Sequence, residues 1–449
     1  MRGAVSMKKF KVNDYGAVRD GKKRGTDAIQ RAIDDAAVAG GVVVFEPGVY
    51  LTGSLFLKSN VEFRVDEGVE IRGIVDETAY PEVWTRVAGV EMDWPAGLIN
   101  VFNQKNVKIT GKGLINGQGE YWWNKFWGED QQGGMRKVYE AKGLRWATDY
   151  DCKRPRLIIV HESSEIEISK LTLIRSPFWN VHICYSQNIK IDSLKIAGSK
   201  GPSTDGVDVD SSEHVLVENC FVDCNDDNIC IKAGRDYDGL RVKKPCQNIV
   251  IRDCEIGQGE GITIGSETSG DIKNIEIHHI KAKKTMNGFR LKSAKTRGGL
   301  IENICVHDIE MNNVKNPLMF ELNWFPAYSY CKIPGNYEGE IPDYWRVLAE
   351  SVVPPERGIP EFRNLRISNI KADNAKVALA TEAYAEKPIK NVHFSNIEIH
   401  AREAGFIKHA EDWKMKNVIL YTGENKELEV ENCKRVELPL VFHTAKMTK

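Results

Sequence analysis

The stretch QNIKIDSLKI (residues 187–196) decides the fold, because its central phrase recurs along the chain. The phrase opens with a polar residue, often Asn, and has apolar residues at its second, fourth and seventh positions. Close copies are NIVIRDC (248–254), NIEIHHI (274–280) and NICVHDI (303–309). Strict alternation with β-branched residues is typical of short strands that have one buried face. Units of ~25 residues cannot bury such a face alone, so they are expected to stack on one another.

Copies of the phrase run from Glu165 to Asn391. They predict an all-β fold, a right-handed single-stranded parallel β-helix (a solenoid) in which each copy forms one coil. Longer steps between copies predict a loop near residues 234–245 and an insertion within residues 324–358. The aromatic-rich residues 120–152 also interrupt the repeats and predict a second insertion of surface loops.

The N-terminal region has helical spacing instead. Ile29, Ile33 and Ala36 share one face of a helix that Gly40 would end. A solenoid needs its open end covered, so this helix is expected to be an N-terminal cap, with residues 8–60 forming the cap and first coils. No Pro- or Ser-rich linker divides the chain, and we expect residues 1–449 to form a single domain.

Composition narrows the classes of partner. The chain has 449 residues, with 62 Lys and Arg against 63 Asp and Glu, so nucleic acid is not an expected partner. No apolar run approaches the ~18–20 residues that span a bilayer, so no membrane association is expected. The N-terminus lacks an apolar signal-peptide core. If the natural chain starts at Met1, we therefore expect a cytoplasmic protein. If the natural chain is longer, we expect a periplasmic or secreted protein. The oligomeric state is left open.

The cysteines follow the repeat. Cys220 and Cys254 fall in a column that Leu and Ile otherwise occupy, which predicts core thiols. The alternative is a metal site formed by Cys220, Cys224 and Cys230. Its spacing is not a paired CxxC, and strand alternation would place the sulfurs on both faces. No metal and no other cofactor is expected.

Polar residues recur one coil apart on one flank of the repeat. Asp205 is followed about one coil later by Asp226-Asp227, then by Glu260, and then by Arg290 and Lys292. Each alone is readily explained as a turn residue or a solvated pair. Because the coil period aligns them, we expect them to stack into one patch of carboxylates and cations.

Clustered carboxylates suit the hydrolysis of a glycosidic bond. One carboxyl group must be protonated to give its proton to the leaving oxygen, and another must be ionised to activate water or attack carbon. Crowding of like charges raises one pKa, while nearby Arg and Lys hold the others down. Guanidinium and ammonium groups also bind the carboxylate of an acidic sugar well.

The chain resembles glycoside hydrolase family 28, the polygalacturonase family of pectin-degrading enzymes. The resemblance reaches about residue 400, and its most specific parts are the ordered aspartate motifs and the Arg-x-Lys motif. The matching segments are DYGA (14–17), TDAIQ (26–30), YLTG (50–53), LKSN (57–60), INGQG (115–119) with Trp122-Trp123, SPFW (176–179), TDG (204–206), Asp226-Asp227, GITIGS (261–266) and RLK (290–292).

The resemblance implies an inverting mechanism without metal. Asp226 would be the general acid, Asp205 and Asp227 would hold and deprotonate the water, and Arg290 and Lys292 would bind a galacturonate carboxylate. One departure is the absence of the family's usual His before Ile-Gly-Ser, where Gly259-Glu260 stands. We expect the charge of Glu260 to help keep Asp226 protonated. The alternatives are that Glu260 binds a sugar hydroxyl or that substrate preference has shifted.

Further residues bear on the substrate. The segment IKAGRD (231–236) is similar to exo-acting bacterial members, so Lys232 and Arg235 are expected to bind substrate. His182 is another groove candidate, or else a structural His. Aromatic residues of the two insertions either close one end of the groove, which would mean exo action, or form small satellite cores.

The leading interpretation is an exo-acting polygalacturonase that cleaves α-linked galacturonate in acidic pectic oligo- or polysaccharides. The close alternative is a rhamnogalacturonan hydrolase or galacturonohydrolase of the same family. Two alternatives come from other classes of protein. A pectate lyase would need calcium and a basic residue that abstracts a proton, and a non-catalytic β-helix carbohydrate-binding module would bind the sugar without cleaving it.

Overall fold

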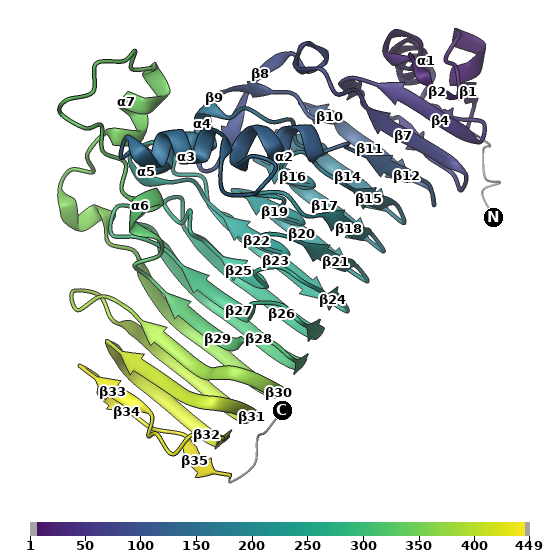
Figure 1. The fold of residues 1–449 in the computed structure, drawn as a ribbon. Helices are drawn as coiled ribbons and strands as arrows, with labels where there is room; N and C mark the ends of the chain where they lie inside the picture. The colour runs from purple at the N-terminus through teal and green to yellow at the C-terminus, as the bar shows by residue number, and fades with distance from the viewer. Residues whose placement is uncertain (1–6, 445–449) are drawn as a thin grey trace.

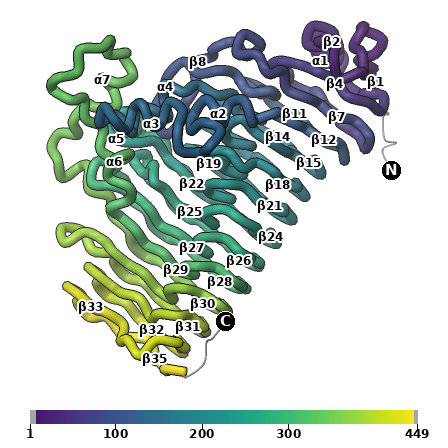
Figure 2. Tube along the Cα trace, in the orientation of Figure 1, coloured from purple at the N-terminus to yellow at the C-terminus, as the bar shows by residue number. Residues whose placement is uncertain are grey.

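The computed structural model describes residues 7–444 and confirms the parallel β-helix (Figure 1). The chain winds continuously from the N-terminal coils to the C-terminal coils (Figure 2). Each coil contributes one strand to each of three parallel sheets, which join where long strands run from one sheet into the next. Strands of successive coils pair in register, as when Ile189 and Ile191 meet Val215 and Val217.

The first sheet carries the site described below. Its strands are β5 (Leu55–Leu57), β10 (Ile99–Phe102), β13 (Ile158–His161), β16 (Val181–Cys184), β19 (Val207–Asp210), β22 (Ile229–Lys232), β25 (Ile262–Ile264), β27 (Asn287–Lys292) and β29 (Asn316–Glu321), followed by parts of β30 and β31 and by β33 (Glu429–Glu431).

The second sheet holds the repeated phrase. Its strands are β1 (Lys9–Lys11), β3 (Val42–Val44), β6 (Glu62–Arg64), β11 (Lys105–Thr110), β14 (Ser164–Ser169), β17 (Gln187–Asp192), β20 (Glu213–Glu218), β23 (Cys246–Arg252), β26 (Ile272–Lys283), β28 (Leu300–Asn312), β30 (Glu361–Glu382), β31 (Ile389–Lys408), β32 (Ala410–Thr422) and β34 (Lys434–Val436).

The third sheet closes the coil. Its separate strands are β2 (Asp20–Arg24), β4 (Gly48–Thr52), β7 (Val69–Gly73), β12 (Leu114–Asn116), β15 (Thr172–Ile174), β18 (Lys195–Ser199), β21 (Phe221–Cys224), β24 (Glu255–Ile256) and β35 (Leu440–His443). Beyond β24 this sheet continues in the second halves of β26, β28 and the later long strands.

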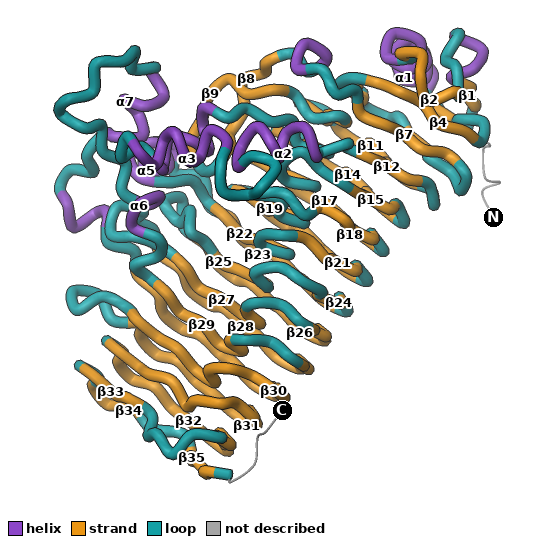
Figure 3. Tube along the Cα trace, in the orientation of Figure 1, coloured by secondary structure: helices purple, strands orange, loops and turns teal. Residues whose placement is uncertain are grey.

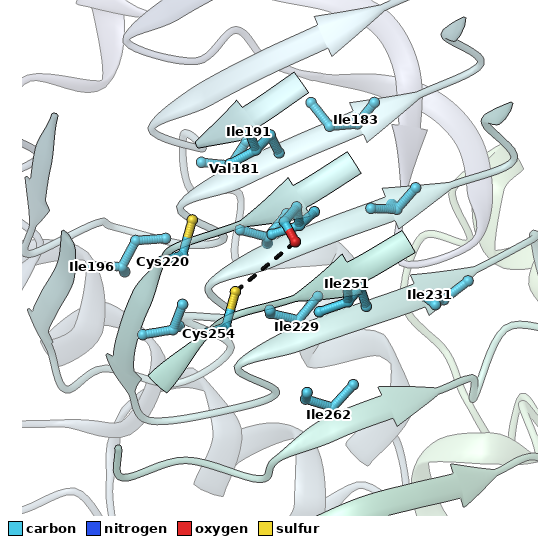
Figure 4. Close-up of a cluster of buried hydrophobic side chains, with 14 of the residues drawn as sticks. Val181, Ile183, Ile191, Ile196, Cys220, Ile229, Ile231, Ile251, Cys254 and Ile262 are labelled. Atoms are coloured by element: carbon cyan, nitrogen blue, oxygen red, sulfur yellow. Dashed lines mark hydrogen bonds between the residues drawn. The ribbon is translucent and has the colours of Figure 1, made fainter. Parts of the chain in front are cut away.

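Columns of inward-facing side chains fill the solenoid, as the repeat predicts. Cys220 and Cys254 lie one above the other among Ile, Leu and Val, and both are buried (Figure 4). Figure 4 also shows the Cys254 thiol directed toward the carbonyl of the neighbouring coil, which is that of Val217. All ten cysteines lie in the described part of the chain and are free thiols. The prediction that Cys220 and Cys254 are core residues is confirmed.

Helix α1 (Thr26–Ala39) covers the N-terminal end of the solenoid. Ile29, Ile33 and Ala36 are fully buried against the first coils, and Gly40 ends the helix in a left-handed conformation with φ 66°. The 3-10 turn η1 (Val12–Tyr15) packs beside it. The predicted cap is therefore present.

The predicted insertions form a layer on one side of the solenoid (Figure 3). Residues 120–152, expected as loops, carry the helices α2 (Glu120–Trp127), α3 (Gly134–Ala141) and α4 (Thr148–Asp151) and the 3-10 turn η3 (Arg145–Ala147). The other elements of the layer are α5 (Asp236–Val242), α6 (Pro326–Ser329), α7 (Asp343–Ala349), η4 (Pro355–Gly358), η2 (Glu77–Ala79) and the antiparallel hairpin of β8 (Glu82–Val87) and β9 (Val90–Pro95).

This layer has a small core of its own. Trp94, Trp146, Tyr150, Phe178 and Trp345 pack together there, away from the main core. Trp146, Tyr150 and Trp345 of the insertions thus belong to a satellite core, whereas Trp122 joins the main core and Trp324, Phe325 and Tyr328 line the pocket described below. Within residues 7–444, no helix is long and apolar enough to cross a membrane.

Candidate active site

The predicted patch forms on the outer side of the first sheet, where the turns before its strands stack coil on coil. Asp205 lies just before β19, and Asp226 and Asp227 lie just before β22. Backbone hydrogen bonds align these turns: Gly206 N–H donates to the Asp227 carbonyl (2.9 Å), and Glu260 N–H donates to the Asp226 carbonyl (2.9 Å). The parallel register of the coils therefore brings together residues that are 20 to 35 positions apart in the chain.

Three carboxylates meet at this point. One oxygen from each of Asp205, Asp226 and Asp227 lies within 4.8 Å of the other two. Asp205 and Asp227 are buried, whereas Asp226 is partly exposed. All three line a pocket of about 150 Å³. Its other lining residues are Ala88, Arg145, Asp149, Phe178, Trp179, Ser203, Lys232, Ser266, Glu267, Lys292, Trp324, Phe325 and Tyr328.

On one side of the pocket, which we term the Lys292 flank, Lys292 meets Asp227 and Trp324. Lys292 Nζ donates to Asp227 Oδ2 at 2.6 Å and lies 4.4 Å from the Trp324 ring centroid. Thr263 Oγ1 donates to the second Asp227 oxygen at 2.7 Å. Burial would raise the pKa of Asp227, but the charges of Lys292, Arg290 and Lys232 outweigh it and lower the pKa to about 2. Asp227 is therefore ionised at any ordinary pH.

On the other side, which we term the Lys232 flank, one lysine serves two carboxylates. Lys232 Nζ lies 3.2 Å from Asp205 Oδ2 and 2.9 Å from Asp208 Oδ1, and 4.1 Å from the Trp179 ring centroid. Burial and the neighbouring charge of Asp208 raise the pKa of Asp205 well above its usual value, and Lys232 offsets this only in part. Asp205 is therefore far more basic than Asp227.

Asp226 lies between the two flanks. Burial raises its pKa well above the usual range, and the charges of Asp205 and Asp227 raise it further. Glu260 adds a smaller effect in the same direction. One protonated and one ionised carboxyl group thus stand side by side, which is the arrangement that acid–base hydrolysis requires.

Arg290, on β27, does not line the pocket but lies beside one of its lining residues, with its guanidinium carbon 5.9 Å from the Trp324 ring centroid. Its Nη1 donates to Glu260 Oε2 and its Nη2 donates to Glu321 Oε2, each at 3.1 Å. Glu260 also accepts from Asn287 Nδ2 at 3.2 Å. The guanidinium group is thus held between two carboxylates that are themselves about one-third exposed.

His182 and Arg235 are not on the pocket surface. For Arg235 this corrects the expectation of substrate contact, and for His182 it agrees with the alternative of a structural His. Both side chains are fully buried. His182 accepts from Arg156 Nη1 (2.6 Å), and Arg235 donates to Asp236 Oδ2 (3.0 Å) and to the Tyr150 hydroxyl (2.7 Å). The layer of hairpin and insertions covers both residues, and the repeat pattern carries no information about that layer.

Several residues in and behind the pocket were not predicted. Asp208 lies on β19, three positions after Asp205; it is fully buried and does not line the pocket. Arg145 pairs with Asp149 and lies near the rings of Phe325 and Tyr328. Arg145 and Asp149 come from the first insertion, where no periodic signal exists, whereas Phe325 and Tyr328 belong to the insertion aromatics that were expected either to close the groove or to form satellite cores.

Two groups of possible metal ligands occur among residues 7–444, and both lie beside fixed cations. One consists of the three pocket aspartates, with the ammonium groups of Lys232 and Lys292 in contact. The other is His182, Cys184 and Asp210, where Arg86 Nη1 donates to Asp210 at 2.9 Å. Positive charge at contact distance opposes a further cation, so we assign no metal to either group.

A larger groove of about 770 Å³ follows the corner between the second and third sheets. Along it Glu255, Lys281, Glu310, Lys371 and Glu398 face one another on successive coils. Opposite charges alternate there and neutralise one another across strands. This groove is typical of a solvated face.

Comparison with known proteins agrees with this geometry. Residues 42–337 match the model of the family described as "Glycosyl hydrolases family 28", and residues 9–64 match "Rhamnogalacturonase A/epimerase, pectate lyase-like". A Vitis vinifera protein named "Probable polygalacturonase" is 30% identical over 400 residues, which cover 86% of this chain and 73% of that protein. An "Endo-polygalacturonase" of Pectobacterium parmentieri is 25% identical over 407 residues, covering 88% of this chain and 86% of the relative.

Solved structures are similar along nearly the whole length. The exopolygalacturonase of Thermotoga maritima has a TM-score of 0.74 at 27% identity, covering 93% of this chain and 92% of that one. The family 28 exopolygalacturonase of Yersinia enterocolitica has a TM-score of 0.75 at 20% identity, covering 97% of this chain and 79% of that one, and shows the shared fold. The family match, the relatives and the carboxylate pocket agree, and this chain belongs to glycosyl hydrolase family 28, the polygalacturonase family of glycoside hydrolases.

Proposed function

We propose that this enzyme hydrolyses α-linked galacturonate bonds at the ends of pectic oligo- and polysaccharides, with inversion at the anomeric carbon. The observation that carries the proposal is the trio of aspartates whose pKa values diverge within 4.8 Å of one another. The pKa values of Asp226 and Asp205 are both raised, so the choice between them follows the family resemblance, by which Asp226 is the general acid. Asp205 and Asp227 hold the water, and Lys292, with Arg290 beside it, receives the acidic sugar.

Two bonds change in this reaction, and the protons balance. Asp226 gives its proton to the glycosidic oxygen as the bond from that oxygen to C1 breaks. The water oxygen bonds to C1 from the opposite face, and its proton passes to the carboxylates that hold it. An α-linkage therefore gives galacturonate first as the β-anomer.

The carboxylate spacing bears on the stereochemistry. In sites with two carboxylates, a separation of ~5 Å accompanies retention and ~6.5–9.5 Å accompanies inversion, because inversion needs room for water. Here a third carboxylate is present, so Asp205 and Asp227 can bind the water between them while Asp226 protonates the leaving oxygen. Inversion is supported by this third group and by the family resemblance.

Action at chain ends is supported by the shape of the pocket. Its volume of about 150 Å³ is below the ~300–1,000 Å³ usual for larger ligands and suits a single sugar ring. Arg145, Phe325 and Tyr328 of the insertions wall it on one side. Proteins named exopolygalacturonase are among the similar structures, and an "Exo-poly-alpha-D-galacturonosidase" of Dickeya chrysanthemi is 25% identical over 367 residues.

A second candidate is a rhamnogalacturonan-directed or galacturonohydrolase activity of the same family. It is favoured by the contacts of Arg290, whose guanidinium already faces Glu260 and Glu321 at 3.1 Å. A uronate carboxylate approaching Arg290 would meet two like charges, whereas the hydroxyls of a neutral ring could donate to them. In this case only the ring that is released would be acidic.

Product chromatography separates these activities. Polygalacturonate and rhamnogalacturonan are each digested, with and without a pre-formed unsaturated non-reducing end. Early monogalacturonate or digalacturonate supports the proposal, and a ladder of oligomers contradicts action at chain ends. Activity that survives EDTA without unsaturated-product absorbance excludes a pectate lyase.

A further inference from the structure

Asp208 is a buried carboxylate for which the reaction described above has no role. It lies on β19, with His182 and Cys230 as its register partners on the adjacent coils. Its side chain is fully buried, and neither oxygen accepts a well-oriented hydrogen bond. A buried charge without donors is unfavourable. Burial raises the pKa of Asp208 to about 7, and the Lys232 ammonium group 2.9 Å away limits that rise.

That ammonium group also faces Asp205. Lys232 Nζ is 3.2 Å from Asp205 Oδ2, and the Trp179 ring covers it at 4.1 Å. One cation thus lies between the water-holding carboxylate and a second carboxylate behind it. The Lys292 flank has the simpler arrangement of one lysine and one aspartate.

We propose that Asp208 is a positioning residue that holds the Lys232 ammonium group beside Asp205 and neutralises part of the charge of Lys232. Asp205 can then accept a proton from the attacking water. This inference rests on the proposed function, in which Asp205 helps to hold that water. It assigns a task to a residue that touches neither substrate nor the reacting atoms.

The Lys292 flank shows a carboxylate without a second one behind its lysine. There Lys292, Arg290 and Lys232 together lower the pKa of Asp227 to about 2, and such a carboxylate is a weak base for water. On the Lys232 flank, burial and the charge of Asp208 keep the pKa of Asp205 raised. After the water proton has moved to Asp205, Asp226 lacks one proton. Transfer of that proton from Asp205 to Asp226, whose oxygens lie within 4.8 Å of each other, returns both carboxyl groups to their starting protonation states.

Other charged and titratable groups also face this pair. Those that act on Asp205 or Asp208 from the surrounding elements are Arg154 and Arg156 before β13, His182 on β16, Asp210 on β19, Cys224 on β21, Asp226 and Asp227 before β22, Cys230 and Lys232 on β22, and Lys292 on β27. Each variant below changes only the Lys232–Asp208 part of this set.

The test is the pH profile of kcat/KM for an oligogalacturonate. Burial raises the pKa of Asp208 itself to about 7, so its charge acts on Asp205 near and above that pH. In Asp208→Asn that charge is absent, so the pKa of Asp205 falls and the acid limb moves to lower pH, while kcat measured above pH 7 falls about tenfold. Lys232→Met moves the acid limb up instead. The double variant returns it toward the wild-type position. Asp192→Asn, a matched change on the solvent side of β17, leaves the profile unchanged.

A direct titration keeps the inference testable without turnover. The protein is labelled with ¹³C-carboxyl aspartate, and the Asp205 signal is assigned by its loss in Asp205→Asn. A lower midpoint for Asp205 in Asp208→Asn supports the inference even if no galacturonide is hydrolysed, in which case only the proposed function fails. Equal midpoints in the two proteins, or an unshifted acid limb in an active Asp208→Asn enzyme, would overturn it.

Discussion

On the Lys292 flank a buried lysine meets one aspartate at 2.6 Å, whereas on the Lys232 flank a buried lysine divides its charge between two aspartates at 3.2 and 2.9 Å. A tryptophan ring covers each lysine, at 4.4 Å and 4.1 Å respectively. Burial tends to raise both pKa values, but Lys292, Arg290 and Lys232 together lower that of Asp227 to about 2, whereas Asp208 adds to the effect of burial and keeps that of Asp205 raised. The balance of cations and carboxylates around each buried aspartate thus decides which of them stays basic.

The largest expected effect comes from the residue between the flanks. Asp226→Asn removes the only proton donor in the proposed mechanism, so kcat should fall ~10²–10⁴-fold while KM changes little. Initial rates on trigalacturonate, together with binding measured by calorimetry, check this. If Asp226→Asn still binds trigalacturonate but no longer hydrolyses it, Asp226 acts in the chemical step. If turnover is unchanged, Asp226 is not the general acid. Asp192→Asn is the control.

Replacing each lysine by methionine tests the difference between the two flanks directly. In Lys292→Met, Asp227 loses its main counter-charge and its pKa rises from about 2, so both water-holding carboxylates gain protons as the pH falls. The acid limb of kcat/KM should then steepen from one proton to two. In Lys232→Met the limb should move to higher pH without steepening, because Asp227 stays ionised. Identical profiles for the two variants would show that the flanks do not differ.

The two tryptophans test how far the flanks depend on their aromatic covers. A desolvated cation–π contact is worth about 0.5–2 kcal/mol, so Trp324→Ala and Trp179→Ala should each lower kcat/KM by about 2- to 30-fold. Trp324 is in an insertion, so its loss should also release larger products from polygalacturonate. Chromatography of the products measures this. An unchanged product pattern in Trp324→Ala would show that Trp324 of the insertion does not determine action at chain ends.

The smallest expected effect is that of Glu260. Its negative charge contributes to the raised pKa of Asp226. Glu260→Gln should therefore lower that pKa and move the basic limb of the profile to lower pH. The shift should be a few tenths of a pH unit, because the side chain is about one-third exposed. If neither limb of the pH profile moves, Glu260 does not affect the pKa of Asp226 and serves only as an ion-pair partner of Arg290.

The coils can be predicted from the sequence because each one repeats the same local pattern. Alternation alone places Ile189 and Ile191 in the core, and the coil period alone brings Asp205 toward Asp226 and Asp227. The same register accounts for Arg290 and Lys292 on β27. A repeating backbone converts sequence spacing into distance, so these residues need no other information.

The layer over the pocket cannot be predicted in the same way. Arg145 and Phe325 reach the pocket from segments about 180 residues apart that carry no repeat. The same layer buries His182 and Arg235, which strand position alone would leave exposed. Helices α2 to α4 form where loops are expected, because Trp122 and Phe126 pack as buried aromatics on a helical face.

The anomeric form of the first product tests the central claim most directly. Wild-type enzyme is mixed with an oligogalacturonate in D₂O, and ¹H NMR follows the anomeric signals of released galacturonate before mutarotation. If Asp205 and Asp227 hold the water while Asp226 protonates the leaving oxygen, β-galacturonate appears first and the α-anomer grows in later. Release of α-galacturonate first would mean that one aspartate attacks carbon, as the spacing under 4.8 Å would suggest for a two-carboxylate site, and would contradict the proposed mechanism.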